Sequence, residues 1–175
     1  MTLDAAGYDL TTSSVTVGAR GVLLGGEGVI TTTTWDSSAG TWTPEESTVV
    51  LRDGGTVKLA PGQSFNRLEI ASDDGRTATW TMTATGAQTP IVTGLKSGSY
   101  LWYLDGVKQG EIEADKDGTI ALSYQSTGLH TLEVKPTSMT AAMDGLEAAI
   151  GIIVALAVLG GVLGMLGKAF GRLKF

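Results

Sequence analysis

The amino-acid sequence predicts an all-β domain followed by a single membrane-spanning helix, and three observations lead to this prediction. Residues 1–137 are rich in threonine, valine and glycine, and they alternate between apolar and polar side chains as half-buried strands do. Turn residues interrupt this pattern about every 8–12 positions. Residues 148–167 then form a run without a charge, a proline or a side-chain hydrogen-bonding group.

The apolar run has the length of a membrane-spanning helix. At a rise of about 1.5 Å per residue, a helix over residues 148–167 is about 30 Å long, which matches the hydrocarbon core of a bilayer. The basic residues Lys168, Arg172 and Lys174 follow the run. Because basic flanks tend to stay on the inner side, we expect the C-terminus inside and the N-terminal domain outside. The three basic side chains are then placed to contact lipid headgroups or the lumen of a particle.

Small residues of the apolar run and its flank lie on one stripe of the expected helix. They recur at spacings of three and four positions and comprise Ala157, Gly160, Gly164, Gly167 and Gly171. Lipid offers no hydrophobic gain for pairing helices, so close backbone approach through small residues favours association. We therefore expect a helix-packing interface here, although glycine is also simply common in membrane helices.

Composition divides the chain into four parts. We assign residues 1–137 to an exterior β-sandwich domain, 138–147 to a neck, 148–167 to the transmembrane helix and 168–175 to a basic tail. A buried helix in a soluble core is the alternative reading of the apolar run, but such a helix usually keeps a polar face.

The strand pattern is clearest in residues 77–85, where apolar side chains alternate with threonines. The Asp-Gly-Gly sequence at residues 53–55 lies between two alternating runs and predicts a hairpin. Four strands separated by turn residues are expected between residues 100 and 135, in the form of a meander. Such a succession is typical of an antiparallel sandwich or barrel.

Two stretches resemble modules of known surface proteins. Residues 35–70 join a W-D-x-x-x-G-T-W-T-P turn to the strands S-T-V-V-L and F-N-R-L-E-I, and they resemble segments of adhesin-like surface proteins of bacteria, archaea and their viruses. Residues 95–124, with L-K-S-G-S-Y and D-K-D-G-T-I, are similar to the end of an immunoglobulin-like or fibronectin-like module. The resemblance implies an immunoglobulin-like or jelly-roll-like antiparallel sandwich that is displayed on a surface. It implies no particular ligand.

Composition also excludes several kinds of chemistry. The chain has 175 residues, a formal net charge of −6 and no cysteine, so disulfides and thiol chemistry are excluded. The acidic balance argues against nucleic-acid binding, except through the basic tail. His130 is the only histidine of the sequence, so neither a zinc site nor a Ser/His triad is expected.

The remaining polar and aromatic clusters predict no catalytic residue, cofactor or metal. Adjacent carboxylates such as Glu111 with Glu113, or Asp73 with Asp74, are better explained as solvated surface than as an acid–base pair. Residues 115–118 resemble the start of a calcium loop but lack the third oxygen ligand and the closing glutamate. A sugar-binding platform is conceivable for the tryptophans, although core packing is their usual role. These are Trp35, Trp42, Trp80 and Trp102.

Together these observations lead us to expect a structural protein. The expected role is a membrane-anchored coat or surface protein of a virus particle, such as an archaeal virus, with the lipid membrane, further copies of itself and other virion proteins as partners. The N-terminal residues lack the basic and apolar segments of a secretory signal. An exterior domain is then explained by a leader upstream of Met1, by late insertion through the C-terminal tail, or by a virion membrane assembled from inside the cell, and the last explanation needs no additional sequence. The alternative is a cell-surface adhesin or carbohydrate-binding display module, which needs a leader and exposed aromatic side chains.

Overall fold

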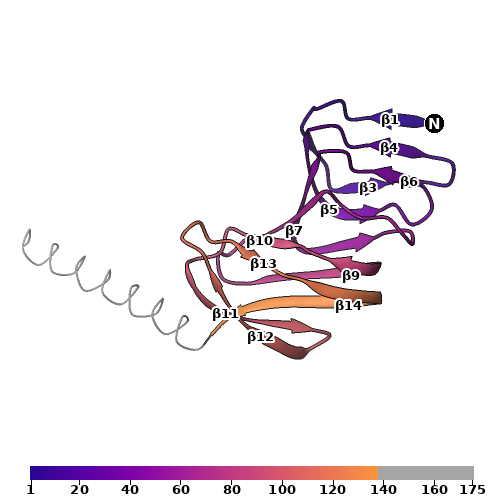
Figure 1. Ribbon diagram of the computed structural model, residues 1–175. Coiled ribbons are helices and arrows are strands. Elements are labelled where there is room, and N and C mark those ends of the chain that lie inside the picture. Colours follow the sequence, from indigo (N-terminus) through magenta and orange to yellow (C-terminus); the bar gives the residue numbers. More distant parts are fainter. Residues whose placement is uncertain (138–175) are drawn as a thin grey trace, which may run out of the picture. The chain divides into compact units, whose positions relative to one another are not determined.

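The computed structural model describes residues 1–137, which contain fourteen strands and no helix (Figure 1). In chain order the strands are β1 (Thr2–Asp4), β2 (Leu10–Thr11), β3 (Ser14–Thr16), β4 (Val22–Leu24), β5 (Val29–Asp36), β6 (Thr41–Thr43), β7 (Thr48–Lys58), β8 (Arg67–Ala71), β9 (Ala78–Gln88), β10 (Ile91–Thr93), β11 (Gly98–Leu104), β12 (Val107–Ala114), β13 (Ile120–Ala121) and β14 (Tyr124–Pro136). The prediction of an all-β domain is confirmed for this part of the chain.

Most neighbouring strands of the N-terminal part run parallel, in three ladders. The first ladder is β1-β4-β6. The second ladder joins β2, the first half of β5, the first half of β7, β8 and β10. The third joins β3, the second half of β5, the second half of β7, and β9. Successive turns of the chain are therefore stacked on one another, as in a solenoid (Figure 1).

The repeating unit is a coil of about 20 residues, which is the lower end of the usual range for solenoid repeats. Thr2 pairs with Val22, and Val22 pairs with Thr41, so each step along a ladder advances by one coil. We call residues 1–21 the first coil, 22–40 the second, 41–66 the third and 67–90 the fourth.

The core consists of columns of apolar side chains that occupy the same register position in successive coils. In the second ladder, Ile30, Val49 and Leu68 lie on consecutive strands and are all buried. Trp35 and Val57 form a matching buried pair in the third ladder. Except for Leu68, the side chains of these two columns are β-branched or aromatic and favour pleated strands, so local propensity and packing agree.

An aromatic cluster fills the space between the ladders. The Trp35 and Trp42 rings are 4.6 Å apart between centroids at 70°, and Phe65 lies 5.3 Å from Trp35 at 72°. Edge-to-face contacts of this kind add to the stabilisation by burial.

The corner that follows the first ladder has the same backbone conformation in three coils. Ala6, Gly26 and Glu45 occupy equivalent positions, two residues beyond the paired residues Asp4, Leu24 and Thr43, and their φ angles are 47°, 62° and 49°. Left-handed residues at this corner turn each coil in the same way. A hydrogen bond of 2.7 Å from Gly26 N to Glu45 Oε2 ties the second coil to the third.

The C-terminal part of the domain is antiparallel. β14 pairs with β9 over residues 124–134 and with β11, which in turn pairs with β12. The turn between β11 and β12 consists of Asp105 (φ 51°) and Gly106 (φ 76°), as a two-residue I′ hairpin requires. This part extends the third ladder beyond β9 to a sheet edge at β12.

The predicted antiparallel sandwich is therefore wrong for the N-terminal part, where the pairing from β1 to β9 is parallel. The predicted hairpin at residues 53–55 is also wrong, because these residues lie within the continuous strand β7. Asp53 Oδ1 accepts the N–H groups of Gly54 and, in the next coil, Thr79, at 2.9 and 2.6 Å. The Asp-Gly-Gly sequence thus makes a bend between two ladders, and the chain continues forward.

The meander prediction is confirmed only for the hairpin of β11 and β12. β13 pairs with β10 instead of β12, and β14 continues through the predicted turn at residues 126–128. The strand predicted at residues 77–85 is confirmed as part of β9, and its apolar face is buried: Ala78, Trp80, Met82 and Ala84.

Candidate functional site

The residues that the sequence marks as candidate site residues lie outside the described part of the chain. These are the helix-packing stripe of Ala157, Gly160, Gly164, Gly167 and Gly171, and the basic residues Lys168, Arg172 and Lys174. The neck, the apolar run and the basic tail also lie there. Within residues 1–137 there is no helix long and apolar enough to cross a bilayer.

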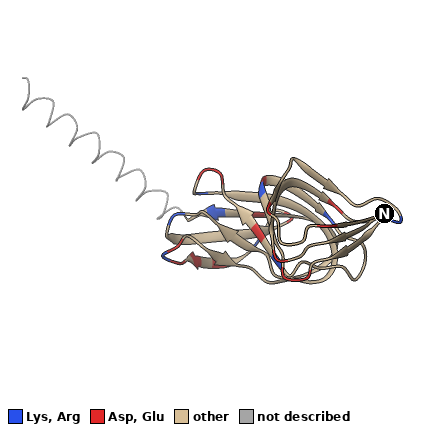
Figure 2. Ribbon diagram, turned by 90° about the horizontal axis from the view of Figure 1, so that it is seen from above, with Lys and Arg blue, Asp and Glu red and all other residues tan. Residues whose placement is uncertain are grey.

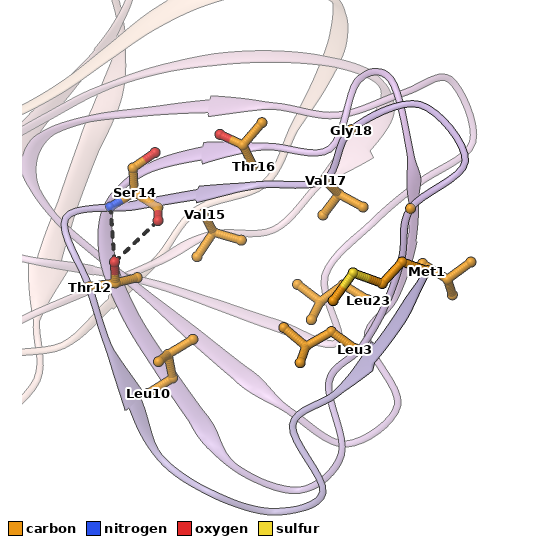
Figure 3. A pocket seen from close by; sticks show the side chains of 12 residues that line it. Met1, Leu3, Leu10, Thr12, Ser14, Val15, Thr16, Val17, Gly18 and Leu23 are labelled. Carbon is orange, nitrogen blue, oxygen red and sulfur yellow. Dashed lines mark hydrogen bonds between the residues drawn. The ribbon is translucent and has the colours of Figure 1, made fainter.

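The first coil holds a mostly apolar hollow of about 400 Å³. Side chains of β1, β2, β3 and β4 line it, and Figure 3 shows Leu3, Leu10, Val15 and Leu23 around the same space. Thr12 lies at its border, where its hydroxyl contacts the backbone N and O of Ser14 at 3.4 and 3.2 Å. The sequence did not predict this site, because its lining residues have the alternating apolar and polar pattern of any half-buried strand.

Among residues 1–137 the core columns end at the first coil, and the hollow lies there. Leu3 is the counterpart of the buried residue Leu23, yet it is 56% exposed. Leu10 is the counterpart of Ile30, which is fully buried, yet it is 39% exposed. Each coil covers the next one, and no described residue covers the first. We call this surface, made by Leu3, Leu10 and the outer edges of β1, β2 and β3, the open face.

Unpaired backbone groups surround the hollow. The first ladder uses Met1 O, which accepts the N–H of Val22, and Ala5 N, which donates to Leu24 O. Because alternate residues of a strand direct their backbone groups to opposite sides, the N–H and C=O groups of Thr2 and Asp4 face away from β4. The open face therefore combines apolar side chains with free strand-pairing groups.

The opposite edge of the domain is protected differently. The edge strand β12 carries Lys108, Glu111 and Glu113, which are exposed charged side chains. Charges on an edge strand discourage pairing with another strand. Ala114 of β12 and Tyr100, which pairs with Ile112 of β12, are buried, so the core is covered at this edge. The open face and the β12 edge thus differ in both polarity and coverage.

Two polar clusters of the described residues have structural roles. His130 Nδ1 lies 2.7 Å from Asp105 Oδ2, and Asp105 Oδ1 accepts the N–H of Thr131 at 2.8 Å. These bonds lower the pKa of Asp105, the backbone bond from Thr131 more than the bond from His130, and they fix the β11–β12 turn to β14. His130 Nε2 contacts the N–H of Thr127 at 3.4 Å. Both ring nitrogens are thus engaged within the sheet.

The two aspartate turns are likewise built on internal hydrogen bonds. Asp115 Oδ1 accepts the N–H groups of Asp117 and Thr119 at 2.9 and 2.8 Å, as in a capped hairpin turn. Burial raises the pKa of Asp74, but four bonds from Thr77, Arg76 and Ser72 outweigh it and lower the pKa to about 2. Within residues 1–137 no group of three or more His, Asp or Glu side chains could hold a metal ion.

Most of the tryptophans that could have formed a sugar-binding platform belong to the core. Trp35, Trp42 and Trp80 are 0%, 4% and 1% exposed. Trp102 is partly buried and packs against the core from β11. These four side chains do not make a common surface.

The positions of Lys and Arg are dispersed among those of Asp and Glu along the ribbon of the described residues (Figure 2). The class that the fold defines is an all-β domain with a parallel, solenoid-like N-terminal part and an antiparallel C-terminal part. No protein-family model, curated protein or solved structure matches this chain.

Proposed function

We propose that this chain is a membrane-anchored structural protein, a coat or surface protein of a virus particle, that assembles with copies of itself. The observation that carries the proposal is the uncharged run of residues 148–167 with Lys168, Arg172 and Lys174 directly behind it. A run of this length and polarity is suited to a bilayer, and its basic flank favours an inner C-terminus. The β-domain would then lie outside.

The β-domain contributes features that suit a structural role. Its stacked coils bury long columns of side chains, so it is a rigid body that can pack in many copies. The open face supplies apolar area and unpaired strand edges in one place. Contacts between β-domains outside the bilayer, together with helix packing through the stripe of Ala157, Gly160, Gly164, Gly167 and Gly171, would form the lattice.

Flotation with liposomes tests the anchor. The purified full chain should rise with the lipid through a density gradient and should resist extraction at alkaline pH. Replacing Val158 and Leu159 with arginine should abolish flotation, since each arginine at a helix centre costs about 2.5–3.5 kcal/mol. The matched control carries arginine at Val107 and Leu129, which are 62% and 65% exposed, and should still float. A double-arginine variant at 158 and 159 that floats normally would contradict the anchor.

Cysteine labelling and imaging test orientation and assembly. Because the chain has no cysteine, Val107→Cys and Leu173→Cys each provide a single label site. On intact native particles or membranes a membrane-impermeant maleimide should label the first and spare the second. Electron cryomicroscopy of the same material should show a regular lattice. Isolated copies on a cell surface would instead favour a display or adhesion protein.

A further inference from the structure

We propose that the open face of the first coil binds the open face of a second copy of this chain, around a two-fold axis. This inference deepens the self-assembly part of the proposed function and rests on it, because it names the surface through which two β-domains associate. It is independent of whether the chain enters a bilayer.

The open face exposes apolar side chains to solvent, and burying them against a partner would be favourable. A solenoid needs a polar terminal coil to remain soluble by itself. The first coil instead leaves Leu3 and Leu10 partly exposed beside an apolar hollow of about 400 Å³. Their counterparts one coil further, Leu23 and Ile30, are 5% and 0% exposed. A second first coil, placed face to face, would give Leu3 and Leu10 the apolar neighbours that their counterparts already have.

The backbone of β1 suits pairing with an identical strand. Thr2 and Asp4 direct their N–H and C=O groups outwards, and a two-fold axis makes two copies of β1 antiparallel. With the axis at Leu3, Thr2 of each copy would lie opposite Asp4 of the other and exchange hydrogen bonds. The two Leu3 residues would then form a non-hydrogen-bonded pair with Cα atoms about 4.5 Å apart, the pair type in which side chains lie closest.

The distribution of charge favours a second copy in this orientation over a head-to-tail stack. The exposed charged residues of the first coil are Asp4, Asp9 and Arg20, so both signs are present and an aspartate of one copy can meet the arginine of the other. β12, the strand at one end of the large sheet, instead carries Lys108, Glu111 and Glu113. An edge with such charges resists strand pairing, whereas β1 to β3 have no such protection except Asp4.

Disulfide trapping tests the arrangement, because the chain lacks native cysteines. The full chain with Leu3→Cys is purified in detergent and oxidised. Non-reducing electrophoresis should show a disulfide-linked dimer as the main species, since the expected Cα separation lies within the range that disulfides span. The matched control is Val107→Cys on β12, which is as exposed as Leu3 and should remain mainly monomeric. A monomeric Leu3→Cys chain, or equal dimer from both variants, would overturn the proposal.

A second measurement separates this interface from helix packing. Light scattering of the detergent-solubilised chain with Leu3→Glu and Leu10→Glu should give half the protein mass of the unmodified chain if β-domain pairing is the association present in the micelle. Gly160→Leu with Gly164→Leu serves as the background in which helix packing is removed. In that background, loss of the dimer on adding the two glutamates supports the proposal, and an unchanged mass refutes it.

The outcomes also distinguish the inference from the proposed function. A chain that floats with liposomes but gives no Leu3→Cys dimer keeps its membrane role and loses this interface. A chain that dimerises through Leu3→Cys but does not float keeps the interface and loses the membrane role. Cross-linking of Leu3→Cys to a different protein in native membranes, in place of the dimer, would mean that the open face binds another partner, and it would contradict a second copy.

Discussion

Individual residues maintain the close stacking of the coils. Gly28 is buried, and a Cβ atom on it would come within 2.4 Å of Tyr8 O in the first coil. Gly25 is as crowded, because its Cβ would meet Pro44 O of the third coil at 2.5 Å. The second coil is thus held between its neighbours at distances that only glycine allows.

We expect Gly28→Ala to destabilise the domain by about 1–3 kcal/mol, the usual cost of overpacking against backbone that cannot move away. Unfolding in denaturant, followed by tryptophan fluorescence, measures the change. Gly18→Ala is the matched control, since a Cβ there meets nothing within 4 Å and the residue has no positive φ. Equal stability of the two variants would show that the coils can separate locally at little cost.

Asp74 gives the fold an acid-sensitive contribution. Its folded-state pKa of about 2 lies below the ordinary value of 3.8, so the hydrogen-bonded carboxylate stabilises the domain above pH 3.8. This contribution should be lost as pH falls from about 4 through about 2. Asp74→Asn should therefore reduce stability at pH 7, with a deficit that shrinks over that range. Asp73→Asn, which removes none of these hydrogen bonds, is the matched control, and unfolding curves at a series of pH values compare the two variants.

At the scale of elements, turn chemistry predicted the local bends better than the direction of the next strand. Asp105 and Gly106 form the hairpin that an Asp-Gly pair favours. Asp53 and Gly54 form the same Asp-Gly pair. The Asp53 carboxylate, however, accepts a hydrogen bond from Thr79 N in the next coil, so the chain bends there and continues as one strand. The difference depends on a contact between residues far apart in sequence, and no local pattern reveals it.

The helix-packing stripe is the element whose prediction stands on the sequence alone. Gly160→Leu with Gly164→Leu should reduce the oligomer size of the full chain in detergent, because two leucines keep the helix backbones apart. Chemical cross-linking or light scattering reads the result. Leucine at Ala155 and Val162, away from the stripe, is the control. An unchanged oligomer in the glycine variant would mean that the stripe is not an interface.

At the scale of the whole molecule, the sequence indicates the fold class but conceals the topology. Alternation of apolar residues identifies strands such as β9 equally well in parallel and antiparallel sheets. The available signal was a recurrence of about 20 residues, as in Val15, Trp35 and Val57, within the period that marks solenoids. The recurring side chains share only apolar character and not residue type. The repeat is therefore recognised from the pairing of the strands and not from the sequence. The open face could not be predicted from the sequence for the same reason, because it is defined by the strand pairing that makes Leu3 and Leu10 the counterparts of Leu23 and Ile30.

Stability should vary along the stack of coils. The first coil has a neighbour on one side among the described residues, whereas β7 pairs on both sides over most of its length. Amide hydrogen exchange should therefore be fastest in β1 to β3 and slowest in β7. Protection of β1 should rise with protein concentration if copies associate through the open face. Uniform protection at low concentration would contradict this gradient.

The stacking of the coils also relates the height of the domain to the number of coils. Each coil adds one strand spacing, about 4.8 Å, to the distance between the first coil and the antiparallel part. The second coil can therefore serve as a unit of length: duplicating residues 22–40 would lengthen the molecule by one increment and leave both of its ends chemically unchanged. The number of coils therefore sets the height of the domain, and the left-handed corners at Ala6, Gly26 and Glu45 mark one coil each.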